Sequence, residues 1–501
     1  MSYARRGMKG TEMRSKEKNR FKCLLLAACL LTGSSIWADD ESNAPRPVPL
    51  TRPAMKQLLE DVKFRTPRIP LPELTEVDRE KLGDQFDNYE SRVRHHYLNG
   101  IELPRPTVPQ TATIDPGKPS AAPAMAAREQ DPSFTLDNVF KVELFWIVSR
   151  VNNCQYCIGH QESKLLGAGL SEDQIAALDG DWTDFQPAKR VAFAFARKFT
   201  YQPHLLNDGD IAGLSAHYSD SQILEMIFSM SGNNSINRWK EAIGVPQRKD
   251  EGGYSRLATR SSGSSEASQE DLKFPRGSYL TPTSSAYMKK ISQVAVIDVD
   301  SKSDSSTCTA ISKRPPLESR EEVEKSLAKA RTRKSRLALV SEELARQAIP
   351  GCSSTVGELP HWVRLIANFP KAGASRFDGI QAAGEKGDLS PLLKSQLSWI
   401  LARQDRAWYS LGQAKMRLQK LGQSDDQIYA LDGNCEHLSE RDRALFRLAK
   451  QLGMSPVVLT DEDVASAVKW AGARDVVQTI SFTTSRASFN RLTESAGLPL
   501  D

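Results

Sequence analysis

The stretch NNCQYCIGH, residues 152–160, is the place in this sequence where reactive side chains cluster. Cys154 and Cys157 are three residues apart, and His160 follows three residues later. Side chains at positions i and i+3 are neighbours on the surface of a helix, so these three would share one face. The spacing therefore predicts two thiols and an imidazole in contact along one helix.

The two cysteines are expected at the start of that helix. Residues 143–151 carry apolar side chains at helical spacing, and Asn152 or Asn153 would cap a new helix that begins at Cys154 and ends at residues 167–169. The first turn of a helix has unpaired N–H groups and the positive end of the dipole, which favour a thiolate. We therefore expect the pKa of the Cys157 thiol to be lowered.

The N-terminus has the pattern of a secretory signal. Residues 1–22 hold eight Lys or Arg and two Glu, an uncharged apolar run follows at 23–33, and Ala38 offers a small residue for cleavage. The apolar run is about half as long as a membrane-spanning helix. We predict that residues 1–38 are removed and that the protein is exported, to the periplasm or the extracellular space, with no stable membrane span. A lipoprotein box ending at Cys29 is the alternative, although little apolar sequence precedes it.

The net charge argues against a nucleic-acid partner. The whole chain is formally +5, and residues 1–38 supply +8 − 2 = +6, which leaves −1 for the mature protein. A nucleic-acid-binding domain needs a basic patch in its folded part, and the mature sequence shows none. We expect no nucleic-acid partner.

Composition divides the rest of the chain into four segments. Residues 39–133 read as a charged helical arm followed by a Pro-rich linker, and residues 134–246 are dense in apolar side chains at helical spacing. Residues 247–316 are Ser-rich and poor in apolar side chains, which predicts a disordered linker, and helical spacing returns in residues 317–501. No alternating strand pattern competes, so the sequence predicts an all-α fold.

The second half of the chain repeats the first. Placing Glu143 on Gln396 gives an offset of 396 − 143 = 253 that holds without a gap until Pro246 meets Pro499. The helical segment ahead of each copy recurs too. Arg52, Leu59, Arg65, Arg68 and Leu71 match Arg320, Leu327, Arg333, Arg336 and Leu339. We therefore expect two tandem helical domains of one kind.

The two copies differ where chemistry would occur. Cys154, Cys157, His160 and Glu143 correspond to Ala407, Ser410, Gln413 and Gln396. Framework residues are kept while the candidate reactive groups are lost, which suggests that those groups do more than support folding. A purely structural cysteine pair would be lost in the same way. The C-terminal copy is therefore interpreted as a degenerate partner that stabilises the assembly or shapes a pocket.

The motif also resembles a known family. The pattern Arg-x-x-Asn-x-Cys-x-Tyr-Cys-x-x-His, followed by Gly-Leu-Ser and a helical pair, resembles the carboxymuconolactone decarboxylase / alkylhydroperoxidase D superfamily. Both copies resemble it, over about half of the chain. The resemblance implies alkylhydroperoxidase D-like helical domains that pack into oligomers, and so either a homo-oligomer or pairing of the two repeats within one chain.

The resemblance also implies roles for four residues. Cys157 would attack a hydroperoxide, Cys154 would resolve the product as a disulfide, and His160 and Glu143 would relay protons. Such a thiol peroxidase has peroxiredoxin-type activity and needs a hydroperoxide substrate and a thiol reductant protein, but no cofactor and no metal. The alkylhydroperoxidase has its histidine four residues after the second cysteine, where this chain has Gln161.

The residues themselves leave other interpretations open. The pair could be a structural disulfide, a general dithiol–disulfide oxidoreductase centre, or part of a non-catalytic helical interaction protein. A zinc site would need a second C-x-x-C or a paired histidine at ligand spacing, and haem attachment would need a histidine where Ile158 stands. Cys308, Cys352 and Cys435 are expected to be structural, either buried or disulfide-bonded.

Overall fold

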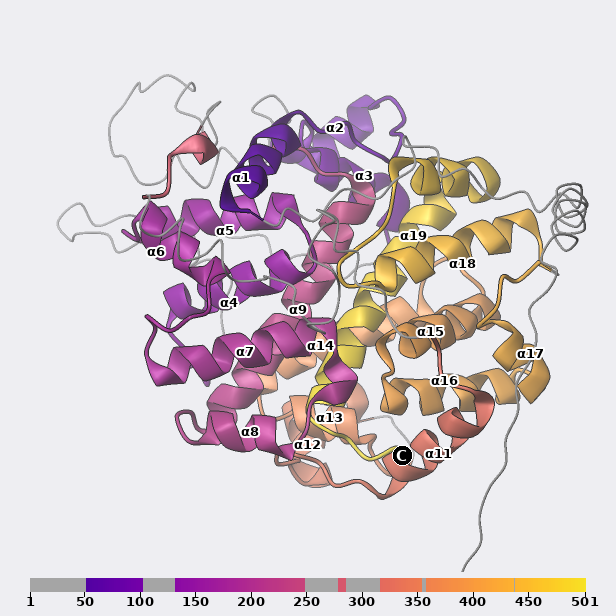
Figure 1. Ribbon diagram of the computed structural model, residues 1–501. Coiled ribbons are helices and arrows are strands. Elements are labelled where there is room, and N and C mark those ends of the chain that lie inside the picture. Colours follow the sequence, from indigo (N-terminus) through magenta and orange to yellow (C-terminus); the bar gives the residue numbers. More distant parts are fainter. Residues whose placement is uncertain (1–50, 102–130, 248–277, 285–315, 354–356, 437) are drawn as a thin grey trace, which may run out of the picture. The chain divides into compact units, whose positions relative to one another are not determined.

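The computed structural model describes residues 51–101, 131–247, 278–284, 316–353, 357–436 and 438–501 (Figure 1). Within these ranges the regular elements are helices and there is no strand, which confirms the all-α prediction. None of the helices in these ranges combines the length and the apolar character needed to cross a membrane. Outside the described residues lie the predicted signal segment, most of the predicted Pro-rich and Ser-rich linkers, and Cys308.

The N-terminal arm is a series of short helices. They are α1 (Arg52–Asp61), η2 (Val62–Phe64), α2 (Glu76–Leu82), η3 (Gly83–Gln85) and α3 (Tyr89–Leu98). Helix α2 begins with a capping box, in which Thr75 and Asp78 exchange side-chain and backbone hydrogen bonds. Helix α1 lies against α5, so the arm is part of the packed structure around the cysteine motif.

The first repeat follows the arm. Its elements are α4 (Asn138–Val151), α5 (Gln155–Gly167), α6 (Glu172–Ala176), η4 (Ala177–Asp179), α7 (Pro187–Tyr201), η5 (Pro203–Leu205), α8 (Asp208–Ser215) and α9 (Asp220–Ile243). Helix α9 ends at Gly244, whose left-handed φ of 69° suits a residue without a side chain. Helices α4 and α5 pack against each other on either side of the short turn that holds Cys154.

The second half of the chain contains several leading helices and then α15 to α19, which follow the order of α4 to α9. Its elements are α11 (Arg320–Thr332), α12 (Glu342–Ala348), η8 (Pro350–Cys352), α13 (His361–Ile366), α14 (Pro370–Glu385), α15 (Pro391–Asp405), α16 (Trp408–Lys420), α17 (Asp425–Ala430), α18 (Glu440–Gly453) and α19 (Asp461–Ser495). Helices α15, α16 and α18 start 253 residues after α4, α5 and α7. Helix α19 joins the counterparts of α8 and α9 across a break at Gly472.

A short segment inside the predicted linker is ordered. The 3₁₀ helix η7 (Ser278–Leu280) packs on α1, and Tyr279 is buried. The prediction of disorder throughout 247–316 is therefore wrong for residues 278–284. The prediction was based on the average composition of a long polar stretch. It missed this segment because a single aromatic residue, Tyr279, anchors it.

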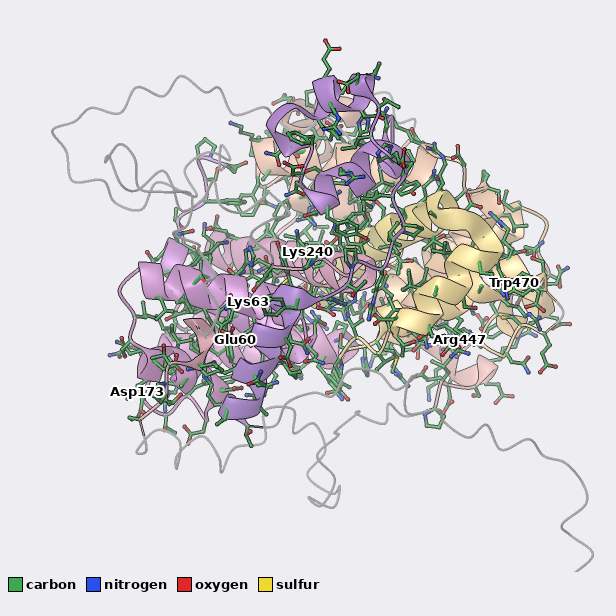
Figure 2. All side chains as sticks on the ribbon, turned by 90° about the horizontal axis from the view of Figure 1, so that it is seen from above. Glu60, Lys63, Asp173, Lys240, Arg447 and Trp470 are labelled. Atoms are coloured by element: carbon green, nitrogen blue, oxygen red, sulfur yellow. The ribbon has the colours of Figure 1, made fainter. Side chains whose placement is uncertain are left out.

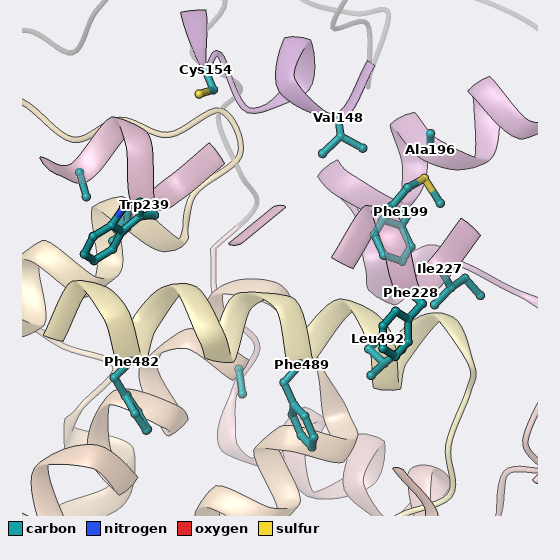
Figure 3. Packing of buried hydrophobic residues seen from close by; sticks show 14 of the residues in the cluster. Val148, Cys154, Ala196, Phe199, Ile227, Phe228, Trp239, Phe482, Phe489 and Leu492 are labelled. Carbon is teal, nitrogen blue, oxygen red and sulfur yellow. The ribbon is translucent and has the colours of Figure 1, made fainter. Parts of the chain in front are cut away.

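The two repeats share one hydrophobic core. Helix α9 of the first repeat packs along α19 of the second. Val148 and Phe199 belong to the same buried cluster as Phe489 and Leu492 of α19 (Figure 3). All these helices are part of one compact unit.

Matching arginines from the two copies cross between the repeats. Arg68 donates to the carbonyl of Leu459 at 3.3 Å, and its counterpart Arg336 donates to the carbonyl of Leu206 at 2.8 Å. Leu206 and Leu459 are themselves equivalent, because 459 − 206 = 253. Each copy therefore donates to the other through its arginine and accepts the equivalent hydrogen bond in return. This reciprocal pattern is that of a two-fold interface.

Candidate functional site

The turn between α4 and α5 places the two cysteines. Asn152 ends α4, Asn153 takes a left-handed φ of 56°, and α5 starts at Gln155. Cys154 is itself the N-cap, and its Sγ accepts a hydrogen bond from the backbone N–H of Cys157 at 3.4 Å. The prediction that an asparagine caps this helix is wrong, because both asparagines are used to close the preceding turn.

The two sulfur atoms lie together inside the protein. The Sγ atoms of Cys154 and Cys157 are 2.6 Å apart, and the residues are 0% and 2% exposed. No disulfide joins them in this structure. Since the sulfurs already lie within van der Waals distance, a disulfide between them needs only a small movement.

Burial dominates the acidity of Cys157. Removal from water raises the pKa of its thiol well above the ordinary value, and the neighbouring Cys154 raises it further. A hydrogen bond with Asn237 and the positive charge of Lys240 act in the opposite direction. The prediction of a lowered pKa is therefore wrong for this arrangement, because loss of solvation outweighs the helix start.

A network of polar side chains fixes the turn before the cysteines. The Nδ2 atom of Asn152 donates to Oδ1 of Asn234 and of Asn237, each at 3.0 Å. The guanidinium of Arg238 donates to Oδ1 of Asn152 at 3.1 Å. All four residues are buried, so these bonds are made where water does not compete. They hold the turn against α9.

The second repeat contributes to the same turn. Ser455 Oγ donates to Oδ1 of Asn152 at 3.0 Å, and the backbone N–H of Val457 donates to the carbonyl of Asn152 at 3.2 Å. Arg238 in turn donates to Ser455 Oγ at 2.7 Å. The copy that lacks the cysteines therefore supports the backbone that presents them.

His160 lies one turn after Cys157 and is nearly buried. Its ring stacks on Tyr156, with centroids 4.5 Å apart and planes at 22°. Its Nδ1 lies 3.2 Å from the carbonyl oxygen of Tyr156 and 2.9 Å from Nε2 of Gln247. With Nδ1 engaged in either tautomer, proton exchange with a reacting group would use Nε2.

Tyr279 extends this group from the ordered segment of the linker. Its hydroxyl donates to Oε1 of Gln247 at 3.2 Å, and its backbone N–H donates to Glu60 Oε1 at 2.8 Å. The ammonium of Lys63 lies 4.5 Å from the centre of the Tyr279 ring. Glu60 and Lys63 mark this place in Figure 2. A line of contacts thus runs from Tyr279 through Gln247 to His160.

Gly159 makes this approach possible. A side-chain carbon at this position would lie 2.5 Å from the hydroxyl oxygen of Tyr279 and 3.0 Å from Nε2 of Gln247. Its counterpart Gly412 faces the side chain of Leu500 instead, and a side-chain carbon on Gly412 would clash with that leucine. Glycine is thus needed in both copies for close packing over the helix.

Lys240 is the cation whose charge lowers the pKa of Cys157. It forms an ion pair with Glu90 of α3, and its ammonium lies 4.8 Å from the centre of the Tyr156 ring. Lys240 is labelled in Figure 2. Glu90 also accepts from the indole N–H of Trp239 at 2.8 Å. Helix α3 therefore positions the charge that opposes the raised pKa of Cys157.

Glu143 is buried on α4 and pairs with Lys189. The ammonium of Lys189 donates to the two carboxylate oxygens at 2.9 and 2.6 Å. Burial raises the pKa of Glu143, and Lys189 opposes the shift. Among the described residues no hydrogen bond joins Glu143 to Cys154, Cys157 or His160, so its part in a proton relay stays a prediction.

The structure brings Cys154 and Cys157 together and places His160 one turn further along α5, in contact with Tyr156 and Gln247. Sequence reasoning missed four further residues around this site. These are Asn237, Lys240, Gln247 and Tyr279. In the second repeat Lys240 is replaced by Thr493 and Gln247 by Leu500. These replacements, like those of the cysteines, are the sequence feature that could have indicated a role at the site. Cys352 and Cys435 are buried free thiols, and neither is in a disulfide.

The arrangement can support dithiol–disulfide chemistry on a small reactant. It holds two adjacent sulfurs, an imidazole one turn away and a cation near the second sulfur. Comparison of the chain with models of known protein families and with curated proteins finds no significant match.

Proposed function

We propose that this protein is an exported thiol peroxidase that reduces hydroperoxides through Cys154 and Cys157. The observation that carries the proposal is the 2.6 Å separation of the two sulfurs, with His160 one helical turn away. The second repeat lacks all three groups. Catalysis is therefore assigned to the first repeat.

The first step oxidises Cys157. His160 takes the thiol proton, and the thiolate attacks the terminal oxygen of the hydroperoxide. The O–O bond breaks, the sulfur becomes a sulfenic acid, and the departing alkoxide receives the proton from His160 to leave as an alcohol. Asn237 and Lys240 favour the transient thiolate, because both lower the pKa of Cys157.

The second step forms the disulfide. The thiol of Cys154 attacks the sulfenic sulfur of Cys157, an S–S bond forms, and one water molecule leaves. The short distance between the sulfurs makes this step faster than further oxidation by a second peroxide. A small external dithiol that can enter the site then returns both cysteines to the reduced state and is itself oxidised to a disulfide.

Burial favours a small substrate over a protein disulfide. Cys157 is 2% exposed, so the sulfur of a folded partner cannot reach it without extensive opening. A hydroperoxide needs a much smaller opening. The geometry thus favours peroxide reduction over general dithiol–disulfide exchange between proteins.

Consumption of hydroperoxide in the presence of dithiothreitol tests the proposal. We expect turnover in the wild-type chain, none in Cys157→Ser, and a single turnover in Cys154→Ser that leaves a sulfenic acid trapped by dimedone. Cys352→Ser is the matched control, because Cys352 is also a buried free thiol and should not affect the rate. Full turnover by Cys157→Ser would disprove the assignment.

A non-catalytic role is the second candidate, and the burial of both sulfurs favours it. In that case the cysteine pair would only pack or cross-link the α4–α5 turn. No variant would then consume peroxide, and the wild-type thiols would resist peroxide during prolonged exposure of the folded protein.

A further inference from the structure

Two adjacent histidines and an aspartate meet where α2 and α3 pack together. Asp78 lies on α2, and His95 and His96 lie on α3. One candidate ligand atom from each residue lies within 4.8 Å of the other two. His95 Nε2 is already 2.7 Å from Oδ1 of Asp78. This cluster has no part in the proposed peroxidase chemistry.

The aspartate is held in place by its role at the helix cap. Its Oδ2 accepts hydrogen bonds from the backbone N–H of Thr75 at 3.0 Å and from the Thr75 hydroxyl at 2.7 Å. Oδ1 is therefore directed to the histidines. A carboxylate fixed by hydrogen bonds to one oxygen is how proteins orient a metal ligand.

His96 supplies a second, independent observation. Its Nε2 atom is buried and has no hydrogen-bond partner in the part of the chain that the structure describes. A buried nitrogen that lacks a partner costs free energy, which a bound ion would recover.

We propose that Asp78, His95 and His96 form a binding site for a divalent first-row transition-metal ion such as Zn²⁺. Two imidazoles and one carboxylate suit these ions, whereas Mg²⁺ and Ca²⁺ require more oxygen ligands. Ligand atoms of a tetrahedral zinc site lie about 3.3 Å apart. The 2.7 Å contact between His95 Nε2 and Asp78 Oδ1 must therefore open slightly, and ligand atoms up to 4.8 Å apart must approach by roughly 1.5 Å. The three residues are only partly buried, which leaves room for water as the remaining ligand.

The ion would tie α2 to α3. Helix α3 carries Glu90, which binds Trp239 and Lys240 of α9. Metal binding should therefore stabilise the part of the arm that positions Lys240. The expected role is structural, because the ligands are not those that surround the sulfur pair.

Calorimetric titration of the untagged chain with Zn²⁺ tests this site. Because thiols bind Zn²⁺, the titration uses the Cys154→Ser/Cys157→Ser background. We expect one Zn²⁺ per chain and a higher melting temperature with Zn²⁺, since the ion binds the folded state. His96→Ala and Asp78→Asn should each weaken binding at least about tenfold. His217→Ala is the control, since His217 is exposed and lies outside the cluster.

The Zn²⁺ affinities of the variants distinguish a specific site from its absence. Equal Zn²⁺ affinity in His96→Ala, Asp78→Asn and His217→Ala would overturn the proposal, as would absence of binding to the background protein. Far-UV circular dichroism checks that each variant is folded. Should His96→Ala unfold, His96→Gln and the visible spectrum of bound Co²⁺ give the same comparison, because loss of an imidazole ligand changes that spectrum.

Discussion

At the scale of single residues, the acidity of Cys157 is set by competition between burial and local charge. Burial and Cys154 raise its pKa, while Asn237 and Lys240 lower it. The helix start alone suggested a lowered pKa, so the decisive quantity was the depth of the sulfur. Depth is a property of the folded chain and is not visible in a nine-residue motif.

Alkylation of Cys157 should report this raised pKa directly. We expect the rate with iodoacetamide, followed by mass spectrometry of the Cys157 peptide, to rise with pH and to have its midpoint above the value of about 8.5 for a free cysteine. The raised pKa also means that the protonated thiol is favoured in the folded state. Stability should therefore be full at neutral pH and decline as the pH rises beyond the unfolded value. An alkylation midpoint below that of the urea-unfolded chain would contradict the raised pKa of Cys157.

Removing the charge of Lys240 should make Cys157 less reactive. Lys240→Met deletes the cation that lowers the thiol pKa, so we expect a higher pKa for Cys157, less thiolate at a given pH and slower alkylation. Lys198→Met is the control, because Lys198 pairs with Asp210 and has no part in the pKa of Cys157. Equal alkylation rates in the two variants would show that Lys240 has no electrostatic role.

At the scale of elements, the helices were predictable and their contacts were not. Hydrophobic spacing predicted the helix before residue 152, and the glycines after Leu166 predicted the end of α5. The spacing says nothing of Gln247 or Tyr279, which reach His160 and Gly159 from 87 and 120 residues further along the chain. Such contacts depend on tertiary packing, which local propensity does not encode.

The packing of Tyr279 over α5 can be tested with a double-mutant cycle. Gly159→Ala places a carbon against the Tyr279 hydroxyl, so we expect a loss of about 1–3 kcal/mol in the free energy of unfolding by urea. In a Tyr279→Ala background that clash is gone, and alanine is favoured over glycine in a helix by about 1 kcal/mol. Gly159→Ala should then be neutral or stabilising. The same loss in both backgrounds would mean that Tyr279 does not pack there.

At the scale of the whole molecule, the internal repeat was the strongest prediction from sequence. The offset of 253 residues reappears in the starts of α15, α16 and α18. The reciprocal pairing of the copies was not predictable, because the sequence overlay shows which residues correspond but not which touch. Arg68 and Arg336 corresponded in the overlay, and only the structure shows that each reaches into the other copy.

Arg68→Ala and Arg336→Ala should have matching effects on stability. Each arginine bonds carbonyl oxygens of both copies, so each truncation leaves several acceptors without their donor. We expect a loss of about 1–3 kcal/mol in the free energy of unfolding for each variant. Arg79→Ala, at an exposed pair with a 3.9 Å contact, should cost less than about 0.5 kcal/mol. An effect of Arg68→Ala no larger than this control would show that the crossing contacts are weak.

The shared core has a consequence for how the molecule behaves at low concentration. Two separate subunits with this interface would come apart on dilution, and the turn that Ser455 and Val457 support would be lost with the partner. Here a peptide chain joins the halves, so their association is intramolecular and does not depend on how much protein is present. The turn before the cysteines therefore keeps its supporting half at every concentration of the chain.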